Sequence, residues 1–257
     1  MAIFEVELFK VFVLVLMRFA GLLVSAPVLG SRNFPAIGKI GLAALCAMLV
    51  TPNVAALEET TPTEPLGFAV MGAGELLIGL MMGFVMTIAF GAIQVAGQLM
   101  DMQSGFGMMN VFNPAMETQF PIFGFYFFII AVLYLLVTDA HHLMLLHLVR
   151  TFEKIPLGGF VVRPALLFHV GKWGSAMFWD GLIIAAPVAG AMLLAYITMG
   201  LMGRVVPQIH LFVVGFPVTI TVGLLMAALV TRLYIGVLDG MFDRMFDNVA
   251  GLVRGMA

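Results

Sequence analysis

Long apolar stretches separated by short polar segments make up most of the chain. A helix needs about 20 predominantly apolar residues to cross the roughly 30 Å of hydrocarbon in a bilayer. Several of the stretches approach or exceed that length. The hydrophobic pattern therefore predicts an all-α, polytopic membrane-type protein. Its expected apolar helices cover Val11–Gly30, Ile40–Leu57, Leu66–Met100, Phe120–Val137, Trp173–Gly203 and Val218–Thr231.

The stretch from Asp101 to Glu117 interrupts this pattern. It is too apolar for an ordinary loop, and it is too rich in glycine, asparagine and proline for a regular helix. Non-helical backbone at membrane depth leaves N–H and C=O groups unpaired, so it is tolerated only inside protein or along a watery passage. We therefore expect this stretch to line or close a passage.

Charged residues are rare inside the apolar segments, and each needs a partner. Arg18 lies near the middle of the first segment, where an arginine requires a neighbouring protein group or water. Glu75 is the only charge in Leu66–Met100, and we expect it to hydrogen-bond to a neighbouring helix rather than carry protons. Glycines recur along the same segment, and small residues let helix backbones approach closely. These glycines are Gly72, Gly74, Gly79, Gly83, Gly91 and Gly97.

Two basic segments are expected to face the cytoplasm, because cytoplasmic loops of membrane proteins are enriched in lysine and arginine. One is the turn with Arg32 and Lys39, and the other is a mixed loop from Arg150 to Lys172. Two segments on one side require an even number of crossings between them. Counting Ile40–Leu57, Leu66–Met100 and Phe120–Val149 as one crossing each gives three. Either Leu66–Met100 doubles back, or these helices do not cross simply.

The chain from Arg232 onward is predicted to form an amphipathic helix. Apolar residues repeat at helical spacing, while Asp239, Asp243, Asp247 and Arg254 occupy other faces. Such a helix could lie on a membrane surface or dock on a partner. The apolar positions are Leu238, Phe242, Met245, Val249 and Leu252 or Val253.

Composition supports the membrane assignment and excludes other classes. The 257 residues are 62% hydrophobic and 10% charged, with a mean hydropathy of +1.12, whereas soluble domains carry about 25% charged residues. Basic residues form no patch interleaved with aromatic residues, so nucleic acid is not an expected partner. Cys46 is the sole cysteine, which excludes an intrachain disulfide.

A polar cluster at Asp139, His141, His142 and His147 raises the question of a metal or proton-relay site. Adjacent histidines point about 100° apart on a helix, so only one of them should share a face with Asp139. A polar helix end is therefore the preferred interpretation, with no metal and no cofactor. No nucleophile lies at a workable spacing from a base, so we expect no catalytic residues and no enzyme activity.

Four segments carry a resemblance to a known family. The most specific are GQLMDMQSGFGMMNVFNP, from Gly97 to Pro114, and GRVVPQIHLFVVGFPVTI, from Gly203 to Ile220. LVTDAHHLMLL and RFAGLLVSAPVLGSRNFPA are secondary matches. With these segments, essentially the whole chain resembles the FliR family of flagellar export-gate proteins, whose injectisome counterparts are called SctT.

This resemblance implies a core subunit of the flagellar type III secretion gate, in the bacterial inner membrane at the flagellar basal body. Its implied partners are FliP-like and FliQ-like subunits, FlhB-like and FlhA-like export components, unfolded substrates and membrane lipid. Residues 1–172 would form a FliP-like helical unit, and residues 173–257 a FliQ-like helical hairpin. Arg18, Arg204, Gln208 and His210 are expected at polar contacts between subunits.

The resemblance also assigns the stretch at Asp101–Glu117 to the plug of the channel. Its core would be Gly105–Glu117, in which the residues that match the family pattern closely are Gly105, Phe106, Gly107, Met108, Met109, Asn110, Val111, Phe112, Asn113 and Pro114. Methionine side chains are soft enough to seal, and glycines let the backbone yield. The alternative hypothesis is a stand-alone secondary transporter with broken helices, in which Gly215 and Pro217 would mark an unwound segment.

Overall fold

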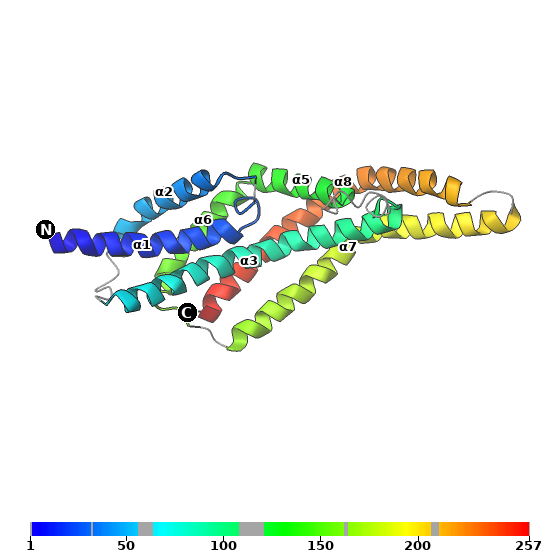
Figure 1. Ribbon diagram of the computed structural model, residues 1–257. Coiled ribbons are helices and arrows are strands. Elements are labelled where there is room, and N and C mark those ends of the chain that lie inside the picture. Colours follow the sequence, from blue (N-terminus) through cyan, green and yellow to red (C-terminus); the bar gives the residue numbers. More distant parts are fainter. Residues whose placement is uncertain are drawn as a thin grey trace. The chain divides into compact units, whose positions relative to one another are not determined.

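Every regular element in the described part of the chain is an α-helix (Figure 1). The computed structural model describes residues 2–31, 33–55, 64–107, 121–161, 164–206 and 211–256. The helices are α1 (Ala2–Ser25), α2 (Ala36–Ala55), α3 (Pro65–Ser104), α5 (Ile122–Val137), α6 (Ala140–Lys154), α7 (Pro164–Val205) and α8 (Leu211–Met256). The all-α class expected from the hydrophobic pattern is confirmed.

The helices also have the length and composition of a polytopic membrane protein. Among the described residues, α1, α2, α3, α7 and α8 each contain a segment long and apolar enough to cross a membrane. Together, α5 and α6 pass the same test as one bent span. The predicted polytopic character is therefore confirmed.

The chain divides into two compact units that interleave along the sequence. The first unit comprises Met1–Ile88, Asp139–Trp173 and Asp243–Ala257, and the second comprises Ala89–Thr138 and Gly174–Phe242. The division at residue 172 rests on a likeness to other export subunits, so it stays a prediction.

Within the first unit, α1 packs beside α2 and against α3 (Figure 1). Glycines permit the contact with α3, because a Cβ atom on Gly79 would overlap the backbone of Arg18 and Leu22. A Cβ atom on Gly83 would likewise meet Ser25. The Ser25 hydroxyl donates to the carbonyl of Leu80 at 3.0 Å. The close helix approach predicted from these glycines is confirmed.

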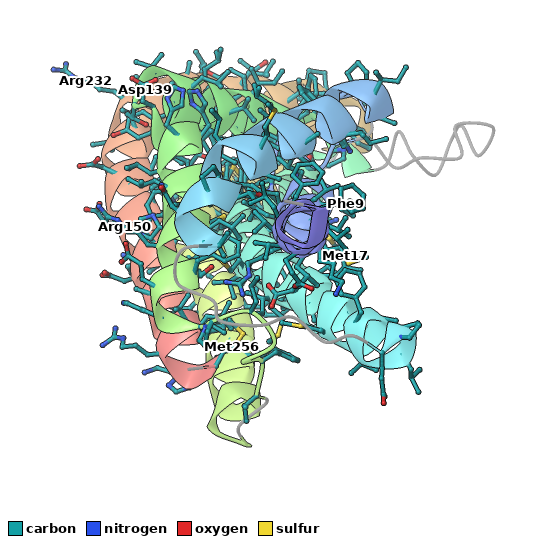
Figure 2. All side chains as sticks on the ribbon, turned by 90° about the vertical axis from the view of Figure 1, so that its left-hand side faces the viewer. Phe9, Met17, Asp139, Arg150, Arg232 and Met256 are labelled. Atoms are coloured by element: carbon teal, nitrogen blue, oxygen red, sulfur yellow. The ribbon has the colours of Figure 1, made fainter. Side chains whose placement is uncertain are left out.

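The exposed surface of the first unit mixes apolar and charged side chains. Figure 2 looks along α1, from which Phe9 and Met17 project, and Phe9 is 64% exposed. Arg150 points outward from α6 in the same view. Exposed apolar side chains also lie along α2 at Ile37, Ile40, Leu45, Met48 and Leu49.

Helix α3 is a single helix of 40 residues. The alternative that Leu66–Met100 doubles back is therefore wrong. Phe120–Val149 was counted as one segment, but α5 ends at Val137 and α6 begins at Ala140. The third segment in the crossing count therefore contains two helices.

Two expected interruptions are helical in the structure. The mixed loop at Arg150–Lys172 is short, because α6 extends to Lys154 and α7 already begins at Pro164. Helix α8 runs through Gly215 and Pro217 without a break. The unwound segment required by the transporter hypothesis is therefore absent at Gly215–Pro217.

The amphipathic tail predicted from Arg232 onward is the last part of α8. Its apolar stripe is buried, whereas Asp243, Asp247 and Arg254 are exposed. The helical spacing was thus predicted correctly. The prediction that this apolar face is free to lie on a membrane or to dock on a partner is wrong, because the chain itself covers the stripe.

Candidate functional site

The described part of the Asp101–Glu117 stretch is its base, Asp101–Gly107, and Met108–Glu117 lies outside the described residues. Helix α3 continues through Ser104, so the first residues of the stretch are helical, contrary to expectation. The backbone leaves the helix at Gly105, whose φ of +90° lies in the left-handed region that favours glycine. Gly105, Phe106 and Gly107 of the expected plug core therefore follow directly on α3.

Asp101 joins the end of α3 to the start of α5. Its Oδ1 atom accepts the backbone N–H of Phe123 at 3.2 Å, and the residue is only 5% exposed. The first N–H groups of a helix have no partner inside the helix. The N-cap residue of α5 is Pro121, which provides no side-chain cap. Asp101 therefore supplies, from another helix, an acceptor that a local capping residue normally supplies.

Close packing reinforces this junction. A Cβ atom on Gly97 would overlap the backbone of Gly124, so α3 and α5 touch at these two glycines. The rings of Phe106 and Phe123 meet edge to face with centroids 5.6 Å apart. The two ends of the segment at residues 108–120 are therefore held together.

Helices α7 and α8 contact the same base, all within the second unit. The Tyr196 hydroxyl of α7 donates to the backbone carbonyl of Gln103. A Cβ atom on Gly105 would lie 3.0 Å from the ring of Phe216. A Cβ atom on Gly223 would lie 3.2 Å from the Ser104 side chain. The start of the stretch is thus fixed from three helices besides α3.

A second site, in the first unit, is built around the buried guanidinium of Arg18. Its Nε donates to Oε2 of Glu75 at 2.5 Å, and both side chains are 0% exposed. Its Nη1 donates to Oγ1 of Thr151 at 2.9 Å, and its Nη2 donates to the carbonyl of Ile155 at 3.2 Å. The Phe152 ring centroid lies 4.0 Å from the guanidinium carbon, a cation–π distance.

The other carboxylate oxygen of Glu75 extends this network. Oε1 accepts the backbone N–H of Gly158 at 3.0 Å. The network therefore links α1, α3, α6 and the turn after α6. The expected role of Glu75 as a hydrogen-bond partner of a neighbouring helix is confirmed. Arg18 was expected at a contact between subunits, but the structure pairs it within the chain, because Glu75 lies at the same level of α3.

The remaining residues expected at polar contacts lie elsewhere. Arg204 is exposed in the last turn of α7. Gln208 and His210 lie outside the described residues.

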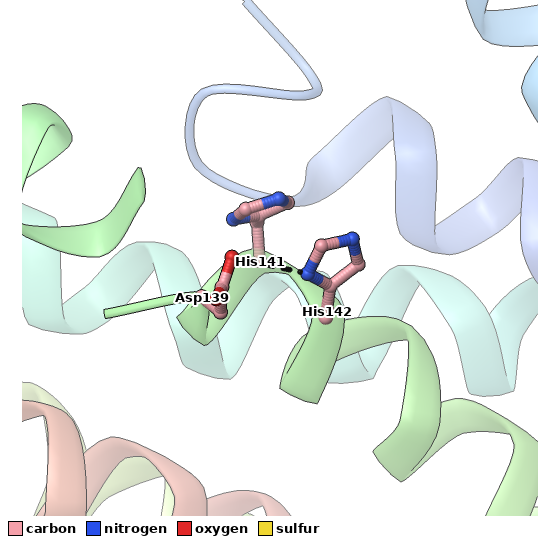
Figure 3. A group of neighbouring side chains, drawn as sticks. All are labelled: Asp139, His141 and His142. Atoms are coloured by element: carbon pink, nitrogen blue, oxygen red, sulfur yellow. Dashed lines mark ion pairs between the residues drawn. The ribbon is translucent and has the colours of Figure 1, made fainter. Parts of the chain in front are cut away.

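Asp139, His141 and His142 come together at the start of α6 (Figure 3). One ligand-type atom from each residue lies within 4.8 Å of the others. Both histidines lie beside Asp139, whereas only one was expected to share a face with it, because Asp139 precedes the helix. Its φ of 54° and ψ of 20° turn its side chain toward both rings. His147 lies apart, stacked on Phe246 with ring centroids 4.9 Å apart.

The sequence matches the family of bacterial export proteins, family 1, over residues 9–245. That match reaches every helix from α1 to α8. The chain belongs to this family of bacterial export proteins.

Individual relatives agree with the family match. The chain is 33% identical to the flagellar biosynthetic protein FliR of Escherichia coli K12 over 215 residues, 83% of this chain and 82% of that protein. It is 30% identical to FliR of Bacillus subtilis 168 over 226 residues, 86% of each chain. It is 27% identical to FliR of Aquifex aeolicus over 217 residues, 82% of this chain and 81% of that protein. The resemblance to the FliR family is confirmed.

In this export protein, sequence reasoning gave no role to Asp101. The residue marked only the beginning of the unusual stretch. The available signal was an acidic residue before a helix break, combined with a following helix whose first residues, Pro121 and Ile122, provide no cap. Asp101 can reach the start of α5 only because Gly97 and Gly124 approach closely, and only the structure reveals that approach.

Replacing Asp101 with alanine is expected to loosen the first turn of α5. Loss of an N-cap acceptor lowers stability by about 0.5–2 kcal/mol. Hydrogen exchange at the amides of Ile122–Gly124 measures the effect directly, and these amides should exchange faster in Asp101→Ala. Asp101→Asn retains an acceptor oxygen and should exchange nearly as the parent does.

The control for this prediction is Gln103→Ala, since the Gln103 side-chain oxygen is buried without a hydrogen-bond partner in the described part of the chain. Gln103→Ala should leave exchange at Ile122–Gly124 unchanged. Equal exchange in Asp101→Ala and the parent protein would refute the capping role.

Proposed function

We propose that this protein is a core subunit of the flagellar type III protein-export gate, where it closes and opens a channel for unfolded flagellar proteins. The family match and the relatives named flagellar biosynthetic protein FliR support the export role. The protein acts as a transport subunit and not as a catalyst. Its place is the bacterial inner membrane, at the flagellar basal body.

The segment from Gly105 to Pro114 is the proposed plug of the channel. The observation that carries this assignment is the joined base, where Asp101 caps α5 and Gly97 contacts Gly124. Because both ends are fixed, the helices that carry the segment would stay together when the proposed plug opens. Its glycines provide compliance, and its methionines and Phe112 provide soft apolar bulk that excludes ions.

Assembly with FliP-like and FliQ-like subunits is the second part of the proposal. Apolar side chains along α7 remain exposed in the single chain, and exposed apolar patches of this kind mark contacts with protein or lipid. Residues 1–172 would correspond to a FliP-like unit and residues 173–257 to a FliQ-like hairpin. The exposed α7 side chains include Phe178, Trp179, Leu182, Ile183, Leu193 and Leu194.

Polar side chains complete the proposed contacts between subunits. Arg204 is exposed where α7 ends, and a neighbouring carboxylate or carbonyl would satisfy its charge. Gln208 and His210 follow in the sequence and would bond across the same interface. FlhB-like and FlhA-like components, unfolded substrates and lipid are the remaining proposed partners.

The secondary-transporter alternative gains no support from the described residues. A transporter of that type needs half-helices whose ends face the solute. Helix α8 is continuous through Gly215 and Pro217, and α7 is continuous through Pro187.

Co-purification from native membranes tests the assembly. An affinity-tagged copy of the chain, expressed from its own locus, should bring down FliP-like and FliQ-like chains in a fixed ratio. A variant with Leu193 and Leu194 changed to lysine should lose them, because charge at an apolar interface is not solvated. Arg150→Glu, a charge change at an exposed position of α6, is the control. A stable monomer that transports a solute in liposomes would contradict the proposal.

A further inference from the structure

We propose that Asp139, His141 and His142 bind a divalent transition-metal ion, of which Zn²⁺ fits the ligands best. The inference stands apart from the export role, and it rests on the geometry at the start of α6. The carboxylate and the two imidazole rings point to the same side of the first turn (Figure 3). Their ligand atoms lie within 4.8 Å of one another.

The spacing fits coordination after a small side-chain adjustment. Ligand atoms bonded to zinc at 2.0–2.2 Å in tetrahedral geometry lie about 3.3–3.6 Å apart. A separation at the 4.8 Å limit would therefore have to close by about 1.2–1.5 Å. Asp139 and His142 have side chains that are 74% and 69% exposed, so their χ angles are free to rotate. Two imidazoles with one carboxylate leave a coordination position for water.

The backbone keeps the Asp139 carboxylate available. An aspartate at a helix N-cap ordinarily accepts an N–H of the first turn through its side chain. Here the left-handed conformation gives that role to the backbone, since the Asp139 carbonyl accepts the N–H of His142 at 2.9 Å. The side chain makes no capping hydrogen bond. Instead, Oδ1 lies 3.3 Å from Nδ1 of His142.

His141 supplies an independent observation. Its Nδ1 atom is buried and has no hydrogen-bond partner among the described residues. Buried polar atoms are nearly always paired with protein or water. The two histidine rings also lie only 4.1 Å apart, centroid to centroid, so both are close enough to reach one ion. A bound metal ion would give the buried Nδ1 atom of His141 a partner.

Titration with Co²⁺ tests the proposal. The full-length protein, purified in detergent with any subunits that accompany it and stripped with a chelator, should show visible d–d absorption as Co²⁺ binds. Zn²⁺ should then displace the Co²⁺. Asp139→Asn, His141→Gln and His142→Gln should each weaken binding by about 100-fold or more, the upper end of the effect of losing an outer-shell partner.

His147→Gln is the matched control, because His147 lies on the same helix outside the cluster. Its Nδ1 already contacts the carbonyl of Leu143 at 2.8 Å. This variant should bind Co²⁺ as the parent does. Absence of Co²⁺ binding, or affinity unchanged in the Asp139, His141 and His142 variants, would overturn the site. Equal weakening in His147→Gln would also overturn it.

Discussion

Replacing Glu75 with alanine is expected to lower the free energy of unfolding by about 3–5 kcal/mol, the usual effect of leaving one member of a buried ion pair unpaired. Arg18 and Glu75 are both fully buried, and their side chains meet at 2.5 Å. The alanine variant leaves the guanidinium without its carboxylate, and it leaves the Gly158 N–H without an acceptor. The thermal unfolding of purified protein and its steady-state amount in membranes measure the loss.

Two further variants separate charge from packing. Arg18→Met combined with Glu75→Leu removes both charges, so it should be less destabilised than Glu75→Ala. Full recovery is not expected, because the Ile155 carbonyl and the Gly158 N–H then lose their partners. Glu7→Ala is the control, since it breaks the partly exposed pair with Lys10 and should change stability by about 1 kcal/mol or less. An unaltered unfolding temperature in Glu75→Ala would refute the buried pair.

Features that repeat along the chain could be predicted from the sequence. Apolar length predicted the helices, because crossing hydrocarbon requires it. Glycines predicted close packing of α3, and Gly79 and Gly83 provide it against α1. Arg18 and Glu75 each required a partner in an apolar segment. Their pairing with each other could not be predicted, since it depends on which helices are neighbours.

Features that depend on the backbone conformation of a single residue, or on the packing around it, could not be predicted from the sequence. Pro217 was expected to break a helix, but α8 begins six residues before it, at Leu211, and continues through it. Lys172 was placed in a loop because it is charged, yet it lies on an exposed face of α7. Asp139 was treated as a helical residue, although its left-handed conformation moves the carboxylate toward both histidines. Periodicity carries no information on such single-residue changes.

Physical chemistry alone predicts one part of the plug assignment, namely that the Asp101–Glu117 stretch must be enclosed. The glycines, asparagines and proline of Asp101–Glu117 indicate non-helical backbone that must be enclosed. That the segment seals a channel followed only from the FliR resemblance. The base of the segment required the structure, because Asp101 and Phe123 are 22 residues apart in the sequence.

Deleting Met108–Asn113 is expected to raise ion leakage across the membrane in cells that also make the partner subunits. The deletion spares Asp101, Gly105 and the α5 cap, so α3 and α5 should keep their contacts. Lowering a barrier by about 1.4 kcal/mol raises a rate about tenfold. Loss of the plug should lower the barrier to ion passage by at least that much, so ion leakage is expected to rise about tenfold or more. Deletion of Glu58–Thr63, an equally long hydrophilic segment, controls for general damage to the membrane.

The most direct measurement of the plug is therefore the ion conductance of membranes containing the assembled subunits, compared between the parent, the Met108–Asn113 deletion and the Glu58–Thr63 deletion. High conductance is expected in the first deletion alone, with the partner subunits still co-purifying. Conductance equal to that of the parent, in a variant that still assembles, would contradict the assignment of this segment as the plug.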